Sequence, residues 1–277
     1  MSDVLAKICA DKRTHVADCK ARRPLSEIRA GLMRIWEAMA SRLTGAALAV
    51  PDTDWHVEKL YAFAREAGAT LVCATHSRYV VDLNRDPDGT ALYPGADNTE
   101  LVPTSTFDRE PVWRDGAAPD AAEVAARVER FFRPYHAILA AEIERVRSAH
   151  GHVVLLDGHS IRSRVARFFD GRLPDFNLGT ASGASADATL ERAAAEVLGS
   201  AQGFSSIVNG RFKGGWITRR YGRPSDGCHA LQLEMAQCAY MAESPPWPWD
   251  AARAAPLLAV LARLVEALID WRPGRLG

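Results

Sequence analysis

Along this chain, stretches in which apolar residues recur with a helical period alternate with short runs of consecutive apolar residues. The first pattern predicts helices and the second predicts strands. Apolar residues recur every three or four positions in five stretches, where we expect amphipathic helices. An aspartate stands at the start of four of these stretches, where its side chain can cap free backbone N–H groups. The helices are expected over residues 24–40, 52–68, 120–150, 187–199 and 250–270.

Short apolar runs between these stretches predict β-strands. One long segment, 86–118, is rich in Pro, Gly, Asp and Thr and has no clear period, so we expect a loop there. Tyr93, Phe107 and Trp113 are spaced through it, which favours an ordered loop packed over the rest of the protein. The strands are expected over 70–75, 78–85, 153–156, 206–209 and 229–235.

The order of helices and strands indicates an α/β sandwich. No internal repeat or linker interrupts it, so we expect a single α/β domain over 41–277. Residues 1–40 form an atypical N-terminal segment in which charged residues follow no period.

The run Val-Val-Leu-Leu at 153–156 draws attention because Asp157, His159 and Ser160 follow it. Strands of an open α/β sheet deliver their carboxyl ends to the crevice where ligands bind. The sequence therefore predicts a carboxylate, an imidazole and a hydroxyl at a candidate site. The alternative is an ordinary strand-to-loop turn with a solvated histidine.

Composition and charge exclude several classes of protein. The chain has 277 residues, of which 48% are apolar and 25% charged, and its 34 basic and 34 acidic residues balance. No basic stripe predicts nucleic-acid binding, and no apolar run is long enough to span a membrane. Five cysteines without a CxxC pair argue against a zinc ribbon and a disulfide framework. With no secretory signal visible, we expect a cytoplasmic protein.

Three further motifs add charged groups that suit a small acidic substrate. Arg78, Asn84 and Arg85 lie in the second extended run, and arginine binds a carboxylate through two parallel hydrogen bonds. Arg211 and Arg219 lie in or beside a glycine-rich segment and are further candidates. Another run ends near a glutamate, which can act as a general base for a metal-bound water. That glutamate is Glu234.

Each of these residues also has a structural alternative. Arg78 and Arg85 could be surface arginines paired with Asp82 and Asp86, and Glu234 could cap a helix or bind Arg219. The chain carries neither a Walker loop nor a Gly-x-Gly-x-x-Gly motif, and no nucleophile elbow surrounds its Asp-Gly-His-Ser motif.

Five motifs in this order resemble the N-formylglutamate amidohydrolase family. They are Asp-Thr-Asp-Trp-His at 52–56, Ser-Arg-Tyr-Val-Val-Asp-Leu-Asn-Arg at 77–85, Asp-Gly-His-Ser at 157–160, Asn-Gly-Arg-Phe-Lys-Gly-Gly at 209–215 and Gln-Leu-Glu at 232–234. The resemblance implies a metal-dependent amidohydrolase that uses zinc, or another divalent metal, to convert N-formyl-L-glutamate into formate and L-glutamate in histidine breakdown. It also implies a three-layer sandwich with a mostly parallel central sheet, of the phosphorylase/hydrolase-like type related to zinc carboxypeptidases.

The resemblance assigns roles to individual residues. His159 is the expected zinc ligand and Glu234 the general base. Asp54 is the expected carboxylate ligand, with Asp52 as the second choice and helix capping as the alternative for both. The arginines and Asn84 would hold the substrate's carboxylates.

The first 40 residues depart from the family pattern. The resemblance begins near Ser41 and runs to about Glu266, whereas the family carries a Ser-x-Pro-His-x-Gly segment ahead of the Asp-Thr-Asp motif. Residues 1–40 contain no Pro-His pair, and their only histidine is His15. Either this segment is read in a shifted frame or from a misassigned start, or the N-terminus has diverged. A catalytic zinc normally needs three protein ligands, so we expect weak metal affinity and low activity.

Two other functions remain open at this point. One is a deacylase or carboxypeptidase-like hydrolase that acts on another N-acyl amino acid. The other is a non-catalytic protein that binds a small dicarboxylate, which would keep the arginines without needing a metal.

Overall fold

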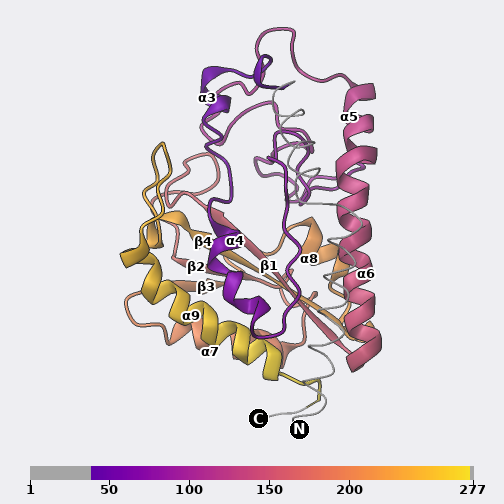
Figure 1. Cartoon of the computed structure of the whole chain (residues 1–277), viewed down its shortest axis with the longest axis vertical. Helices are drawn as coiled ribbons and strands as arrows, with labels where there is room; N and C mark the ends of the chain where they lie inside the picture. Colours follow the sequence, from indigo (N-terminus) through magenta and orange to yellow (C-terminus); the bar gives the residue numbers. More distant parts are fainter. Residues whose placement is uncertain (1–38, 275–277) are drawn as a thin grey trace. The chain divides into compact units, whose positions relative to one another are not determined.

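A computed structural model of the chain describes residues 39–274. The chain divides into two compact units, Met1–Leu43 and Thr44–Gly277, which are described separately. Of the first unit only Met39–Leu43 is described, so the atypical segment and nearly all of the helix expected over 24–40 lie outside the described residues. All elements below belong to the second unit (Figure 1).

A four-stranded sheet lies at the centre of this unit, in the order β1-β4-β2-β3. β1 is parallel to β4, β2 is parallel to β3, and β2 is antiparallel to β4. The expectation of a mostly parallel sheet is therefore wrong, because the sheet is mixed. A helix joins β2 to β3, as parallel neighbours require, whereas the described connection from β1 to β2 contains no helix. The strands are β1 Val153–Ile161, β2 Phe176–Gly179, β3 Ser206–Val208 and β4 Cys228–Ala236.

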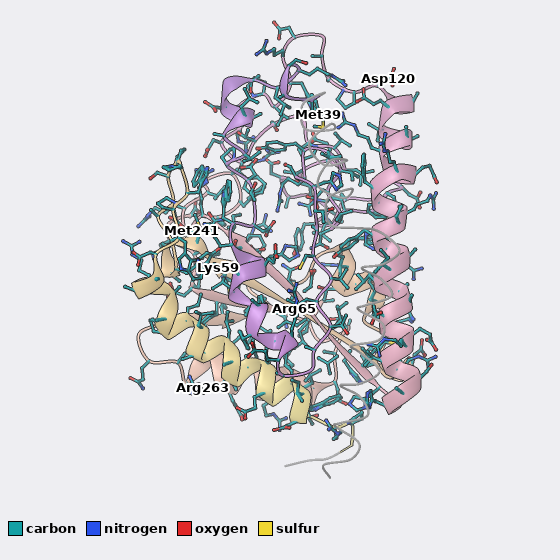
Figure 2. The ribbon with its side chains drawn as sticks, in the orientation of Figure 1. Met39, Lys59, Arg65, Asp120, Met241 and Arg263 are labelled. Carbon is teal, nitrogen blue, oxygen red and sulfur yellow. The ribbon has the colours of Figure 1, made fainter. Side chains whose placement is uncertain are left out.

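Three long helical stretches begin where the sequence predicts. Asp120, Asp187 and Asp250 each accept a hydrogen bond from a backbone N–H of the first turn, so each caps its helix as expected. Figure 2 shows Asp120 at the start of its helix. The helices are α3 Gly45–Leu48, α4 Val57–Leu60, α5 Ala121–Arg127, α6 Arg133–His150, α7 Ala188–Gly199, α8 Trp216–Tyr221 and α9 Ala251–Asp270.

The long stretch from α5 to α6 contains a wider π-helical turn, Val128–Phe132. It lies directly before Pro134, which occupies the first turn of α6. A proline ring clashes with the carbonyl four residues earlier in an α-helix, and the wider turn places this proline at a helix start instead. Three 3₁₀ turns complete the described helical elements: Ala62–Arg65, Pro224–Asp226 and Gln237–Ala239.

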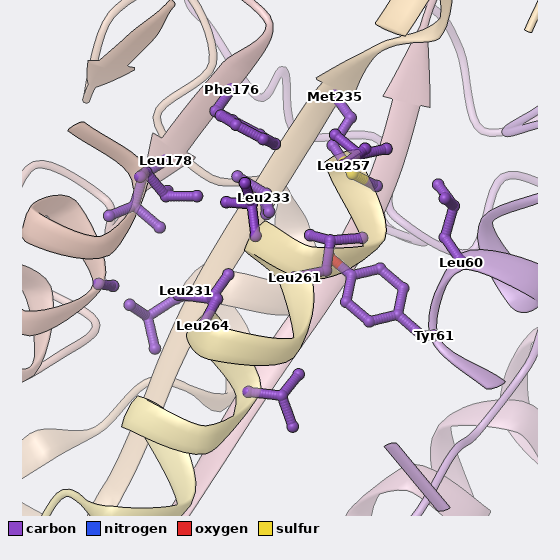
Figure 3. Close-up of a cluster of buried hydrophobic side chains, with 14 of the residues drawn as sticks. Leu60, Tyr61, Phe176, Leu178, Leu231, Leu233, Met235, Leu257, Leu261 and Leu264 are labelled. Atoms are coloured by element: carbon purple, nitrogen blue, oxygen red, sulfur yellow. The ribbon is translucent and has the colours of Figure 1, made fainter. Parts of the chain in front are cut away.

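One face of the sheet packs against α4, α7 and α9 in the main hydrophobic core (Figure 3). Leu231, Leu233 and Met235 alternate along β4 toward this core and are fully buried. Leu257, Leu261 and Leu264 cover them from α9. Burying one such side chain is worth about 1.5–3 kcal/mol, so this face anchors the sheet.

The opposite face of the sheet contacts α6 and α8. Val153 of β1 and Cys228 of β4 share a smaller core with Leu139 and Ile143 of α6 and Ile217 of α8. Residues further along β1 and β4 on this same face are polar, and they form the candidate site described below. The helices α6 and α8 thus cover the part of this face around Val153 and Cys228, and the polar residues of β1 and β4 lie at its other end.

The structure corrects several local predictions. Residues 70–75 and 78–85 are not strands but turns and irregular backbone, although Leu71 and Val72 still pack against the cores. An apolar run alone does not distinguish a strand from a buried irregular segment. The apolar pattern also predicts neither β2, which follows β1, nor α8, which follows the glycine-rich segment of Arg211.

The segment after Asp52 also differs from its expectation. Neither Asp52 nor Asp54 caps a helix, because α4 begins after His56, which has φ 60° and makes no side-chain cap. The 86–118 loop, by contrast, holds no helix or strand of its own, and Phe107 and Trp113 are buried in it. Within residues 39–274, no helix is both long and apolar enough to cross a bilayer.

Candidate active site

The polar end of the sheet brings His159 and Glu234 together. They are partners in the parallel register between β1 and β4, where Asp157 pairs with Gln232 two residues earlier. Side chains two residues apart lie on the same face of a strand, so all four project from one face. β1 continues to Ile161, so the prediction that the strand stops before Asp157 is wrong: His159 belongs to the strand itself.

Both ring nitrogens of His159 face carboxylates. Its Nδ1 lies 3.1 Å from Asp54 Oδ1, and its Nε2 lies 3.0 Å from Asp157 Oδ1. Asn84 Nδ2 lies 2.9 Å from the same Nε2 and donates to Asp157 Oδ2 at 3.3 Å. Burial alone would lower the pKa of His159, but the carboxylates of Asp157 and Asp54 outweigh it and raise this pKa well above its usual range.

Asp54 is bound by three groups at once. Its Oδ1 accepts from the backbone N–H of Ser160 at 2.9 Å as well as facing His159, and its Oδ2 accepts from Arg78 at 2.6 Å. Although burial opposes it, the charges of Arg78 and His159 hold the pKa of Asp54 well below its usual range. Asp54 therefore orients the imidazole as an ionised partner. Asp52 is bound separately, by the Tyr79 hydroxyl at 2.8 Å and by a backbone N–H.

Glu234 is buried, with only 8% of its surface exposed, and it lines a pocket. Its carboxylate makes no hydrogen bond to any other residue that the structure describes. Burial raises the pKa of Glu234 to about 8, against the opposing charge of His159. A carboxyl group of this kind exchanges a proton near neutral pH, as a general acid or base must.

The glycine-rich segment after β3 fixes the amide of Asn84. Gly215 N donates to Gln232 Oε1 at 2.6 Å, and Ile217 N donates to Asn84 Oδ1 at 2.8 Å. A Cβ atom at Gly215 would lie 2.3 Å from Asn84 Nδ2. Only glycine allows this approach, which explains the Gly-Gly pair at the start of α8. Opposite Gln232, Gly179 makes similar room for the same segment.

Arg78 and Arg85 line the pocket but are held by protein groups. Arg78 binds Asp54 and lies 3.5 Å from Asp82. Arg85 donates from all three nitrogens, to the Thr99 carbonyl and hydroxyl and to the Asn84 carbonyl. Asp82 also lies 3.9 Å from Arg85. The alternative of surface arginines is therefore met only in the pairing of Arg78 with Asp82, because both arginine side chains are largely buried, at 17% and 19% exposed.

The other two arginines differ in position. Arg211 lines the pocket, and its Nε donates to the Phe168 carbonyl at 2.5 Å. Arg219 is exposed and outside the pocket lining, and its Nε donates to the Gly214 carbonyl at 3.1 Å. The alternative in which Glu234 binds Arg219 is not formed in the described part of the chain.

Comparison with known proteins places this arrangement in a family. The sequence pattern of N-formylglutamate amidohydrolase matches residues 31–241. The chain belongs to the N-formylglutamate amidohydrolase family. It is 46% identical over 239 residues to the N-formylglutamate deformylase of Pseudomonas putida, covering 86% of this chain and 89% of that protein. Its identity to the N-formylglutamate deformylase of Pseudomonas aeruginosa is 47% over 238 residues, with the same coverage.

A solved structure of the same family shares the fold. The N-formylglutamate amidohydrolase of Ralstonia eutropha JMP134 superposes with a TM-score of 0.67 at 27% sequence identity, covering 82% of this chain and 87% of that one. The α/β class predicted from the sequence is thereby confirmed.

The described residues of this amidohydrolase do not by themselves hold a metal ion. Between residues 39 and 274, no three His, Cys, Asp or Glu side chains converge as metal ligands. Asp54, the expected carboxylate ligand, faces Nδ1 of His159, and both of its oxygens already accept hydrogen bonds. On the Nε2 side, Asp157 is the one carboxylate of residues 39–274 that lies within 3.0 Å. A catalytic zinc normally takes three protein ligands, which this set does not supply.

Sequence reasoning placed the Asp157 carboxylate at the candidate site without giving it a partner, and it assigned no role to Gln232, Tyr93 or Phe168. Asp157 precedes His159 by two residues, and Gln232 precedes Glu234 by two. Strand alternation would have placed each pair on one face, had β1 been extended past residue 156. Tyr93 and Phe168 reach the pocket from irregular segments, and no local pattern predicts such a contact.

Proposed function

We propose that this amidohydrolase hydrolyses N-formyl-L-glutamate to formate and L-glutamate. The observation that carries the proposal is the pairing of Glu234 with His159 on one face of the sheet, in a pocket that arginines line. Relatives named N-formylglutamate deformylase, at 46% and 47% identity, support the choice of substrate.

In this mechanism Glu234 moves the protons. Its ionised form takes a proton from water as the water oxygen attacks the formyl carbon, and its protonated form then gives that proton to the glutamate nitrogen as the amide bond breaks. A pKa of about 8 for Glu234 keeps both forms accessible near neutral pH. Arg78 lines the same pocket, where Asp54 and Asp82 hold its guanidinium in place and offset part of its charge. Its remaining positive potential favours the oxygen that becomes negative in the tetrahedral intermediate.

His159 and its neighbours organise the floor of the pocket. Asp54 and Asp157 fix the imidazole from both sides, and Asn84 donates to Asp157 beside it. Groups held in this way need no reorganisation during the reaction, which is the main source of electrostatic catalysis.

Zinc, the histidine-breakdown context, the cytoplasmic location, the three-layer architecture and the relation to zinc carboxypeptidases stay predictions of the sequence. The steps above use protein groups alone, because the described residues do not make a metal site. Absence of nucleic-acid and membrane partners is likewise an expectation from composition.

Formate release from three substrates tests the proposal. N-formyl-, N-acetyl- and N-succinyl-L-glutamate share the glutamate moiety and differ only in the acyl group. We expect formate from the first, with much slower cleavage of the other two. Preferred cleavage of the acetyl or succinyl compound would identify a different deacylase. Binding of glutamate without cleavage of any of the three would identify a dicarboxylate-binding protein.

A further inference from the structure

Arg211 is held among aromatic rings at one side of the pocket. Its guanidinium carbon lies 5.1 Å from the ring centroid of Tyr93, 5.7 Å from that of Phe168 and 5.5 Å from that of Phe212. All four residues line the pocket. Rings around a guanidinium attract it through their π faces and shield it from water, so they fix its position without neutralising its charge.

The two terminal nitrogens of Arg211 have no hydrogen-bond partner among the described residues. Within residues 39–274 only Nε donates, to the Phe168 carbonyl. No described carboxylate pairs with Arg211, although Asp97 lines the same pocket, because Asp97 is paired with Arg109 and Arg167. The structure therefore leaves the planar edge that binds a carboxylate through two hydrogen bonds free.

The other arginines of the pocket lack such an edge. Arg78 is engaged by Asp54 and Asp82. Arg85 donates from every nitrogen to protein oxygens. Of the three described arginines that line the pocket, Arg211 is thus the one whose terminal nitrogens can donate to an external anion without breaking an existing contact.

Two aromatic rings connect the surroundings of Arg211 with those of the His159 cluster. Arg78, which binds Asp54, lies 5.1 Å from the centroid of Phe107. The Phe107 ring packs edge-on against Phe168 at 5.0 Å, and Phe168 contacts Arg211. Phe107 and Phe168 thus lie between the guanidinium groups of Arg78 and Arg211 in this series of contacts. We expect a substrate whose formyl group lies at Glu234 to meet Arg211 with another part of its structure.

We propose that Arg211 binds the side-chain carboxylate of the substrate's glutamate moiety and so makes the pocket select a distal carboxylate over a neutral group. This inference rests on the proposed function, and it names the residue that determines specificity at that site. A site built to pair a charged group discriminates strongly against an analogue that lacks the charge, because its own polar group is left unpaired.

The test compares N-formyl-L-glutamate with N-formyl-L-glutamine, which has the same shape and no distal charge. In Arg211→Met, we expect kcat/KM for the glutamate substrate to fall by about 10- to 100-fold, the range for a lost hydrogen bond to a charged group. For the glutamine substrate we expect a change below about twofold, since that substrate gains nothing from the charge. Arg211→Lys keeps the charge but loses the planar fork. Its kcat/KM for the glutamate substrate should therefore lie between those of the unaltered chain and Arg211→Met.

Arg130→Met is the matched control. Arg130 also lies over a ring, 5.5 Å from the centroid of Phe131, but it is exposed and outside the pocket lining. This variant should leave the ratio of the two kcat/KM values unchanged. The inference would be overturned if the ratio of kcat/KM for the glutamate and glutamine substrates were the same in Arg211→Met as in the control. An equal fall in kcat/KM for both substrates would overturn it too.

Calorimetric binding of L-glutamate and L-glutamine separates this inference from the proposed reaction. We expect the unaltered chain to bind glutamate more tightly, and Arg211→Met to lose that preference while still binding glutamine equally well. A chain that releases no formate but shows this pattern would contradict only the proposed hydrolysis. A chain without any preference for glutamate would overturn the role of Arg211.

Discussion

His159 and Glu234 occupy opposite positions in the parallel register of β1 and β4, and both side chains project from the same face of the sheet. Both residues have raised pKa values in this shared buried site. The raised pKa favours the charged form of His159 and the neutral form of Glu234. The backbone register therefore sets the distance between the proton-transferring group and the histidine cluster, more firmly than a loop could.

The raised pKa of Glu234 makes stability depend on pH. Burial raises this pKa from 4.5 to about 8, so the folded chain keeps a proton that the unfolded chain loses over that interval. The contribution of Glu234 is fully present below pH 4.5 and is lost as pH rises through about 8. As pH rises through this window, we expect the free energy of unfolding of the unaltered chain to fall more steeply than that of Glu234→Gln. The difference in slope should be at most about 1.4 kcal/mol per pH unit. Denaturant unfolding of both proteins in chelator-treated buffer at several pH values measures this difference. If the free energies of unfolding of the two proteins changed in parallel with pH, the prediction would be contradicted.

Replacing Asp54 by Asn should loosen the histidine cluster. The substitution removes the charge that binds Arg78 and faces His159. We expect a loss of about 2–3 kcal/mol, because breaking a fully buried pair costs about 3–5 kcal/mol and Asp54 remains 28% exposed. The pKa of His159, followed by NMR, should fall at the same time.

Asp226→Asn is the control for that substitution. Asp226 pairs with Arg223 at 2.9 Å, but both side chains are about half exposed, at 54% and 47%. An exposed pair contributes little, so we expect a change within about 0.5 kcal/mol. If Asp54→Asn and Asp226→Asn were equally stable, the contacts of Asp54 would contribute no more to stability than an exposed ion pair does.

Gly215→Ala tests the packing that fixes Asn84. The new Cβ would lie 2.3–2.5 Å from three atoms of the Asn84 amide, so that side chain must move away from Asp157 and His159. We expect a destabilisation of about 1–3 kcal/mol, typical of overpacking, together with a lower kcat. Gly45→Ala is the control, since a Cβ at Gly45 meets nothing within 4 Å. Equal thermal stability and activity of both variants would show that the close approach is unimportant.

Much of the fold could be predicted from the sequence where elements are long. The helices that begin after Asp120, Asp187 and Asp250 each combine a capping aspartate with an apolar stripe, and two local signals agree there. β4 was predicted because its alternation continues over most of its nine residues. The four-residue β2 and six-residue α8 are too short to show a period, and tertiary packing decides them.

The candidate site was predicted in its components and not in its contacts. His159, Glu234, Asp54, Arg78 and Asn84 do converge, as their motifs suggested. Their partners could not be derived, because the apolar run ends at residue 156, before Gly158, whereas the parallel register with β4 carries β1 to Ile161. A glycine was needed there because a Cβ would lie 2.8 Å from the Tyr61 ring.

Zinc titration tests the prediction of weak metal affinity. One imidazole with two flanking carboxylates, one of them already hydrogen-bonded through both oxygens, is a poor zinc site. We expect calorimetry to show no tightly bound ion at a ratio of one per chain, and His159→Ala to change the titration little. One tightly bound zinc per chain would show that the chain completes the site with a further ligand.

The most direct test of the account measures formate released from N-formyl-L-glutamate by the unaltered chain and by Glu234→Gln. The amide keeps the shape of Glu234 but cannot take a proton from water, and general acid–base catalysis is worth about 10²- to 10⁴-fold. We expect formate and glutamate in equal amounts from the unaltered chain, even at a low rate. In the variant we expect a loss of that order, with its thermal stability retained. Equal formate release by both proteins would contradict the role of Glu234, and no release by the unaltered chain would contradict the proposed reaction.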